Sequence, residues 1–326
     1  MDRNLHALGE ALRSLPEAAA TTAVVPLSTG HSNETYLLEG ADLILRLPPR
    51  AEPLLEGLGV LAQAETMRVV AAADNPPPVP RIIYVDNGSL IGTPFFLMER
   101  IKGEMFGDYE VPDWLSTPDD SFRDSLSAAY VGAIVDVHNV APIEPFGAPV
   151  TPLEELQRWR RLAARAGNHE LLEVMDRLSK LPAPVSGPPS VVHGDPKPGN
   201  ALWDGSRLAA LLDWEMGYNG EPLGDLGYML FFFASDDHPA FPSCDVPGIW
   251  NRERIVAAWE EGTGRSASGV AWHEAAAITK IAAILSHGKY LYDSGQSTDE
   301  RMGGWGEHVS YTVSLSRAMT TSLFAD

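Results

Sequence analysis

The stretch 193–215 constrains the fold of this chain more than any other part of its sequence. Within six residues it carries an acid, a lysine and an amide, at Asp195, Lys197 and Asn200, and a second acid follows at Asp213. Short apolar segments just before Asp195 and just before Asp213 predict strands on both sides. The polar residues are therefore expected in a loop that neighbouring strands hold in place.

Phosphoryl transfer from a metal nucleotide needs these kinds of side chain. A carboxylate orients the acceptor hydroxyl, a cation faces the moving phosphate, and an amide with a second carboxylate holds Mg²⁺. Each residue alone has an ordinary alternative, because Gly-Asp-Pro and Pro-Gly-Asn also favour turns. Their occurrence together favours the catalytic interpretation.

Composition sets broad limits on the rest of the chain. The 326 residues are enough for two domains, or for two lobes around one cleft. A hydrophobic content of 44% and a charged content of 21% are ordinary for a folded globular protein. The net charge of -20 argues against a nucleic-acid partner, since counterion release needs a basic surface. Such a surface would attract cations at long range, or simply maintain solubility.

The cysteine count and the hydropathy pattern indicate in which cellular compartment the protein is expected. A single cysteine, Cys244, excludes an internal disulfide and disfavours a cysteine-bound metal. The chain begins with an amphipathic stretch that contains acids, unlike a secretory leader, and no apolar run approaches the roughly 18–20 residues that span a bilayer. We therefore expect a cytoplasmic protein with no membrane partner. The oligomeric state is not predicted.

The first hundred residues have mainly strand-like patterns. Leucines at helical spacing predict a short leading helix, and a later helix ends at three consecutive prolines, 76–78. A small polar turn, 28–33, separates the first two strands. The expected strands are 23–27, 35–38, 43–47, 81–85 and 94–98, with the second helix at 59–73.

Beyond Gly103 the pattern becomes mainly helical. Only two strands are expected there, at 190–193 and 208–213. A mainly β first part and a mainly helical second part predict an α+β architecture with a cleft between two lobes. The expected helices are 121–140, 152–165, 170–180, 222–233, 252–261 and 271–292, with one more near the C-terminus.

Several motifs, taken in order, resemble the aminoglycoside phosphotransferase-like family of small-molecule kinases. The motif His-Gly-Asp at 193–195, followed by Asn200, Asp-Trp-Glu at 213–215 and Gly-Glu-Pro-Leu-Gly-Asp-Leu-Gly at 220–227, is the most specific part. Three earlier segments are similar to a bacterial branch akin to the kinase domain fused to some acyl-CoA dehydrogenases; they are 28–36, 45–49 and 94–103.

This resemblance implies a protein-kinase-like fold of two lobes. Residues 1–101 would form a small nucleotide-binding N-lobe, and residues 102–326 a helical C-lobe with the catalytic loop, the metal site and the acceptor pocket. Asp195 would align the acceptor hydroxyl and accept its proton. Lys197 would reach the γ-phosphate, with a plain surface lysine as the alternative. Asn200 and Asp213 would offer hard oxygen ligands to Mg²⁺.

The resemblance also assigns nucleotide contacts to the first lobe. Arg46 stands where protein kinases carry a phosphate-binding lysine, and Glu65 would hold it, unless Glu65 is an ordinary exposed helix residue. The connector of Glu99, Arg100 and Ile101 would present backbone groups to adenine. The phosphate loop would consist of Ser28, Thr29, Gly30, His31, Ser32 and Asn33. It lacks the Gly-x-Gly-x-x-Gly pattern, and alone it would indicate only a hairpin.

Four neighbouring residues are expected to support the site. His193 is interpreted as a structural residue hydrogen-bonded beneath the loop. Glu215 would contact metal or its water, or orient a basic side chain. Asp225 would cap the helix that follows Pro222, or brace the catalytic loop. Glu221 stands where the family more often has aspartate.

The favoured hypothesis is an ATP-dependent O-phosphotransferase that uses Mg²⁺ and a small-molecule hydroxyl acceptor. A nucleotide-binding pseudokinase without turnover is the alternative. A metallohydrolase built on Asp195, Asp213, Glu215 and His193 is disfavoured, because the chain lacks an HxH or HExxH spacing there. The acceptor stays open among antibiotics, hydroxyacyl thioesters, choline-like compounds and sugars.

Overall fold

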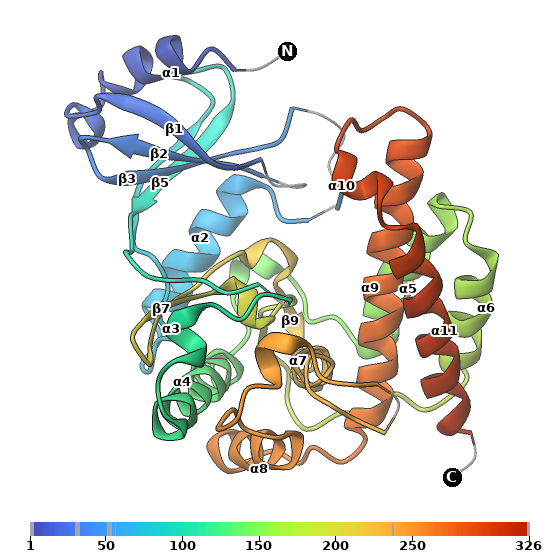
Figure 1. Cartoon of the computed structure of the whole chain (residues 1–326). Coiled ribbons are helices and arrows are strands. Elements are labelled where there is room, and N and C mark those ends of the chain that lie inside the picture. Colours follow the sequence, from blue (N-terminus) through green and yellow to red (C-terminus); the bar gives the residue numbers. More distant parts are fainter. Residues whose placement is uncertain are drawn as a thin grey trace.

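The computed structural model describes residues 3–29, 33–50, 54–55, 57–107, 109–236 and 238–324. A small β-sheet with one flanking helix forms one end of the molecule, and helices dominate the other (Figure 1). The α+β architecture expected from the sequence is confirmed.

The first part is a five-stranded antiparallel sheet with the strand order β1-β2-β3-β5-β4. Helix α1 (Leu5–Leu12) precedes the sheet, and α2 (Val60–Ala71) lies in the chain between β3 and β4. The strands are Ala23–Thr29 (β1), Glu34–Glu39 (β2), Leu43–Leu47 (β3), Ile82–Asn87 (β4) and Pro94–Glu99 (β5).

The two faces of this sheet have different roles, because successive side chains of a strand point to opposite sides. On β3, Leu43, Leu45 and Leu47 join the hydrophobic core against α1. The residues between them, Ile44 and Arg46, line a cleft on the opposite face. The strand period therefore places the guanidinium of Arg46 in the cleft.

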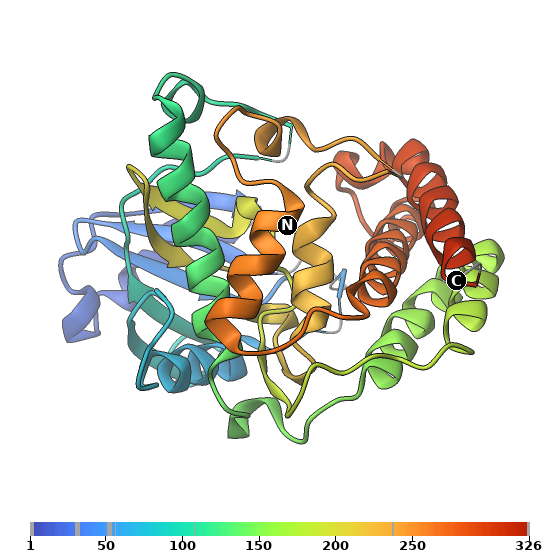
Figure 2. The same cartoon turned by 90° about the horizontal axis from the view of Figure 1, so that it is seen from below.

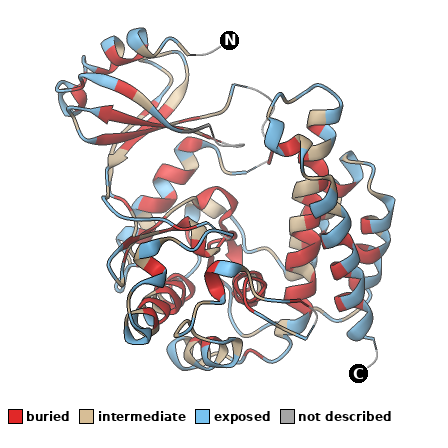
Figure 3. Ribbon diagram, viewed as in Figure 1, coloured by how far each residue is buried: buried red, intermediate tan, exposed pale blue. Residues whose placement is uncertain are grey.

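The larger part is built around helix α9 (Val270–Asp293). Helix α7 packs against it, as do α5, α6 and α11, and Figures 1 and 2 show this group of helices from two directions. Much of α9 is buried (Figure 3). The other helices are α3 (Asp113–Ser116), α4 (Asp120–His138), α5 (Pro152–Arg165), α6 (His169–Leu178), α7 (Leu223–Leu230), α8 (Arg252–Thr263), α10 (Glu300–Gly303) and α11 (Gly306–Ser322).

Helix starts follow the expected local chemistry. Thr151 and Glu154 form a capping box at the start of α5, with Pro152 in the first turn. The carboxylate of Asp119 accepts from the N–H of Phe122 at 3.0 Å and so caps α4. These short-range bonds fix where α4 and α5 begin.

Two small antiparallel pairs of strands hold the functional loops. Strands β6 (Ser190–Val192) and β9 (Tyr218–Gly220) pair, as do β7 (Ala201–Asp204) and β8 (Arg207–Leu211). The short strands β7 and β9 were not predicted. The strand expected to reach residue 213 ends at Leu211, because Asp213 has left-handed backbone angles, φ 68° and ψ 59°, which do not fit a strand.

In the parts of the chain that the structure describes, no helix combines the length and the apolar character that crossing a bilayer requires.

We expect Leu45→Ala to lower the free energy of unfolding by about 3 kcal/mol, because it removes a leucine side chain from a packed core. Leu45 is 0% exposed, whereas Val185 is 66% exposed. Urea denaturation of both alanine variants measures the difference, and Val185→Ala should change stability by less than about 0.5 kcal/mol. Equal losses in the two variants would contradict the described core.

Candidate active site

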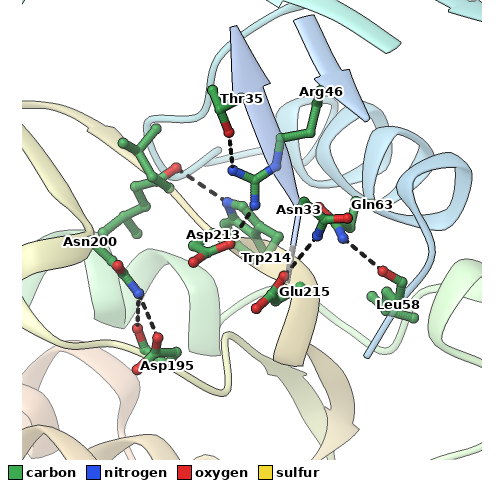
Figure 4. Close-up of polar contacts among 12 residues, drawn as sticks. Asn33, Thr35, Arg46, Leu58, Gln63, Asp195, Asn200, Asp213, Trp214 and Glu215 are labelled. Atoms are coloured by element: carbon green, nitrogen blue, oxygen red, sulfur yellow. Dashed lines mark hydrogen bonds and ion pairs between the residues drawn. The ribbon is translucent and has the colours of Figure 1, made fainter. Parts of the chain in front are cut away.

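A cleft of about 370 Å³ lies between the five-stranded sheet and the β7–β8 hairpin. Apolar side chains form walls on both sides, Leu27 and Ile44 from the sheet and Leu202 from the hairpin. Residues 99–101 line it where the chain leaves β5. Arg46, Asn200 and Asp213 bring polar groups to the same cleft (Figure 4). A flat apolar ring with an anionic extension would match this arrangement of walls and polar groups.

Arg46 connects the sheet to the loop after β8. One of its amino groups donates to Asp213 Oδ1 at 2.6 Å, and the other donates to Thr35 Oγ1 at 2.8 Å (Figure 4). The expected pair of Arg46 with Glu65 is not formed. The carboxylate of Glu65 is largely exposed and lies 3.8 Å from the guanidinium of Arg68.

Helix geometry explains this correction. Gln63 and Met67 lie on the face of α2 that lines the cleft, and each residue of a helix turns by about 100°, so Glu65 points away from that face. Gln63 is buried and donates to the carbonyl of Leu58 at 2.6 Å. The sequence pattern identified the helix correctly but selected the wrong face of it.

Asn200 is oriented by Asp195, the candidate base. Its Nδ2 group donates to Asp195 Oδ2 at 2.8 Å and to the Asp195 carbonyl at 2.9 Å. The side-chain oxygen of Asn200 is therefore the atom left to meet a cation. The N–H of Leu212 donates to the Asn200 carbonyl at 2.8 Å, which holds Asn200 beside the segment of Asp213.

The donor set fits a small, hard cation such as Mg²⁺. Asn200 offers an amide oxygen, and Asp213 offers a carboxylate in which one oxygen is bound by Arg46. Within the described ranges, no group of three or more His, Cys, Asp or Glu residues could hold a metal ion. Magnesium commonly binds through one or two protein ligands, with water and phosphate oxygens as the rest.

Asp195 is a buried carboxylate surrounded by cations. Burial alone raises its pKa, but the ammonium of Lys197, a hydrogen bond from the Tyr228 hydroxyl and the charge of Lys280 together hold the pKa below its usual value. Lys197 Nζ lies 3.7 Å from Asp195 Oδ2, and its side chain is partly exposed. At neutral pH Asp195 is therefore an ionised hydrogen-bond acceptor.

His193 lies beneath the loop, as expected, and its ring bonds are structural. Nε2 lies 3.0 Å from the Leu212 carbonyl, Nδ1 accepts from the N–H of Asp195 at 3.3 Å, and the ring contacts that of Trp214. Burial lowers the pKa of His193, so the neutral form with a proton on Nε2 fits both bonds. His193 thus ties the loop of Asp195 to the segment that leads to Asp213.

Asp225 braces the same loop from α7, in agreement with the prediction. Its carboxylate accepts from the backbone N–H groups of His193 and Gly194, at 2.7 and 2.8 Å. His138 Nε2 lies 3.1 Å from it, and Trp259 donates to the other nitrogen of that ring. Gly194 has φ +85°, and a Cβ there would lie 2.1 Å from a backbone oxygen, so only glycine fits this turn.

Three of the six residues expected in the phosphate loop, Gly30, His31 and Ser32, lie outside the described residues. Ser28 and Thr29 are the last residues of β1. Asn33 is buried, and its Nδ2 donates to Glu215 Oε2 at 2.7 Å (Figure 4). Glu215 therefore binds an amide of the first lobe; its expected contact with metal, with metal-bound water or with a basic side chain stays a prediction.

The connector after β5 lines the cleft, but two of its side chains are engaged elsewhere. Glu99 accepts from the N–H of Arg81 at 2.8 Å, and Arg100 donates to Asp42 at 2.9 Å. Ile101 also lines the cleft. The expectation that this connector contributes backbone groups remains a prediction.

Tertiary structure adds residues to the site that were not predicted. Tyr228 of α7 and Lys280 of α9 both act on Asp195. Lys280 interrupts an apolar helical run, 275–285, and a lone lysine within such a run was the available signal. Glu221 is buried as well. Its carboxylate accepts from the N–H and hydroxyl of Ser186 and from the N–H of Leu223.

Comparison with known proteins is consistent with this geometry. The model of the family described as "Phosphotransferase enzyme family" matches residues 23–275. That range begins with β1 and ends within α9, and it includes Asp195, Asn200 and Asp213.

Curated relatives are considerably longer than this chain. Acyl-CoA dehydrogenase family member 11 of Rattus norvegicus is 27% identical over 301 residues, which are 86% of this chain and 38% of the relative. Acyl-CoA dehydrogenase family member 10 of Mus musculus is 28% identical over 212 residues, 61% of this chain and 19% of the relative. The chain thus spans less than half the length of these relatives.

Solved structures share the fold over nearly the whole chain. A candidate aminoglycoside phosphotransferase from Ralstonia eutropha has a TM-score of 0.73 at 21% identity, covering 97% of this chain and 98% of that one. The streptomycin–ATP–APH(2'')-IIa ternary complex has a TM-score of 0.58 at 16% identity, covering 98% and 99%. The expected kinase-like, two-lobe fold is thereby confirmed.

We expect Asp225→Asn to lower the free energy of unfolding by about 3 kcal/mol at pH 7. The buried carboxylate accepts from His138 and from the N–H groups of His193 and Gly194, and an amide cannot replace it there. Although burial raises the pKa of Asp225, its hydrogen bond and charge interaction with His138 hold that pKa below the usual value. The carboxylate thus stabilises the fold above its unfolded pKa of about 4, and this contribution is lost as pH falls through the lower folded pKa.

Denaturant titrations of the two proteins at several pH values measure this effect. The stability gap should be full at pH 7 and should shrink below about pH 4. Asp176→Asn is the control, since Asp176 forms a half-exposed pair with Arg160 and should cost less than about 1 kcal/mol. A gap that stays constant into acid would contradict the role of the Asp225 charge.

Proposed function

The chain belongs to the phosphotransferase enzyme family, and we propose that it transfers the γ-phosphate of Mg-ATP to a hydroxyl of a small molecule. One observation carries this proposal: Asn200 and Asp213 line the same cleft as Arg46, and Asn200 is hydrogen-bonded to Asp195. A nucleotide in the cleft and an acceptor above Asp195 would then meet at one place.

The nucleotide would occupy the cleft of about 370 Å³. Adenine would lie between Ile44 and Leu202, near the backbone of residues 99–101, and Arg46 would bind phosphate oxygens with its planar guanidinium. The loop 28–33 would cover the phosphates. ATP in the complex of APH(2'')-IIa, a protein of the same fold, supports this choice of cofactor.

Asn200 and Asp213 would hold the magnesium ion. When bound, Mg²⁺ neutralises charge on the phosphate oxygens. Because Asn200 Nδ2 donates to Asp195, the side-chain oxygen of Asn200 is left to bind the ion. Arg46, the proposed phosphate-binding cation, donates to one oxygen of Asp213, the proposed metal ligand. The two roles are therefore joined by one hydrogen bond.

Asp195 would orient the acceptor hydroxyl and accept its proton late in transfer. Its lowered pKa keeps it ionised, and a weak base suffices when the transition state is loose. Lys197, 3.7 Å from the carboxylate, would face the transferring phosphate. Catalysis would then rest on positioning and charge neutralisation, without a covalent enzyme intermediate.

The acceptor is proposed as a small hydroxylated molecule, with no nucleic-acid or membrane partner. The acidic chain, with a net charge of -20, disfavours nucleic acid. We propose the cytoplasm, where Mg-ATP is abundant, as the place of the reaction. ATP consumption across a panel of alcohols, amino sugars and hydroxyacyl thioesters identifies the acceptor class.

We expect Asp195→Asn to lower phosphate transfer by about 1,000-fold, because the acceptor proton loses its base. Binding of Mg-ATP should stay within about twofold, since Asp195 does not contact the nucleotide in this proposal. Product formation and isothermal titration measure the two quantities. Asp204→Asn, an exposed acid on the β7–β8 hairpin, is the matched control. Mg-dependent ATP binding without transfer to any acceptor would instead favour the pseudokinase alternative.

We expect Asp213→Asn to remove the magnesium-dependent part of ATP binding. In the wild type, Mg-ATP at 100 times its Kd should add about 2.7 kcal/mol of stability, and EDTA should remove most of it. Thermal unfolding with ATP, with and without Mg²⁺, measures this gain. Glu65→Gln should behave as the wild type, because Glu65 points away from the cleft. A magnesium response retained by Asp213→Asn would exclude Asp213 as a ligand.

A further inference from the structure

A buried lysine from the middle of α9 reaches the loop of Asp195. Lys280 is only 7% exposed, and its ammonium donates to the carbonyl of Gly194. The same nitrogen lies 4.8 Å from the ring centre of Trp159 and 5.0 Å from that of Tyr228. Burial of an ammonium is costly, so a lysine persists in such a place only where its contacts offset that cost.

Lys280 and Asp225 hold opposite sides of one short segment. The N–H of Gly194 donates to Asp225 of α7, and the carbonyl of Gly194 accepts from Lys280 of α9. Asp195 follows directly in the chain. Because the backbone at Gly194 is in the left-handed region, a small rotation of this peptide would redirect the carboxylate of Asp195.

The charges around Lys280 are consistent with this arrangement. Burial lowers the pKa of Lys280, whereas the carboxylates of Glu155, Asp195 and Asp225 raise it in part. Arg158 is the other charged group that acts on it. Lys280 lies beyond the range 23–275 that the family model matches, so nothing in that match assigns it a role.

We propose that Lys280 is a positioning residue, whose bond to the Gly194 carbonyl fixes the direction of the Asp195 carboxylate toward the acceptor. The catalytic part of this inference rests on the proposed function. The structural part concerns the loop alone and is measurable without any acceptor.

The test compares the wild type with Lys280→Met, which keeps the length and the apolar stem but loses the donor. Hydrogen exchange of the amides of Gly194 and Asp195 reports on the loop, and we expect it to become about tenfold faster. With water as the acceptor, ATP hydrolysis should lose about 100-fold in kcat, while KM for ATP stays within about twofold.

Lys280→Arg is the rescue variant. A cavity of about 40 Å³, lined by Lys280, Trp159 and Tyr228, leaves room for the larger head group. Arginine keeps a donor for the Gly194 carbonyl and a cation for the two rings. Recovery of most of the lost kcat, and of slow amide exchange, is expected.

Glu274→Gln is the matched control on the same helix. Glu274 is a buried charge that pairs with Arg252, so its loss should lower stability without changing kcat or exchange in the loop. Equal effects of Glu274→Gln and Lys280→Met would overturn the proposal, as would Lys280→Met with unchanged exchange. If the wild type neither hydrolyses ATP nor transfers phosphate, the proposed function fails, and amide exchange still decides the role of Lys280.

Discussion

The carboxylate of Asp225 accepts from two consecutive backbone N–H groups, and the geometry of the site depends on this buried interaction. It holds His193 and Gly194 in a turn whose positive φ at position 194 suits glycine. His138 and Trp259 complete the surroundings of the carboxylate. A buried charge with several donors resists rotation, since each lost bond would leave a polar group unpaired in an apolar interior. These bonds therefore restrict rotation of the loop directly before Asp195, and so fix the direction of the Asp195 side chain.

From this turn, hydrogen bonds extend to the first lobe. Asn200 binds Asp195, and its carbonyl accepts from the residue before Asp213. Arg46 then joins Asp213 to the sheet, and Asn33 joins Glu215 to the end of the loop before β2. The groups assigned to base, metal and phosphate thus belong to one connected network across the cleft. The effects of substitutions at two of these neighbouring positions are therefore not expected to be additive, because polar groups that share partners are not independent.

Much of the fold could be predicted because local patterns determine it. Apolar spacing and prolines located most helices, and the alternation on β3 accounts for both the core position of Leu45 and the cleft position of Arg46. The site motif also was recognised, since Asp195, Asn200 and Asp213 lie close together in the chain. Among the short strands, β6 was predicted from its two consecutive valines, whereas β7 and β9 escaped prediction because they are similarly short and lack β-branched residues.

The sequence by itself determined the residue types and their order: two acids and an amide around short strands, which is the set of side chains that the proposed phosphoryl transfer needs. Only the tertiary structure decided which partners they have. Glu65 was the natural partner of Arg46 along the chain, but the rotation of α2 turns it outward, and Asp213 takes its place. Lys280 reaches Gly194 from a helix far along the chain. Such contacts depend on how helices pack against a loop, and no local pattern encodes that packing.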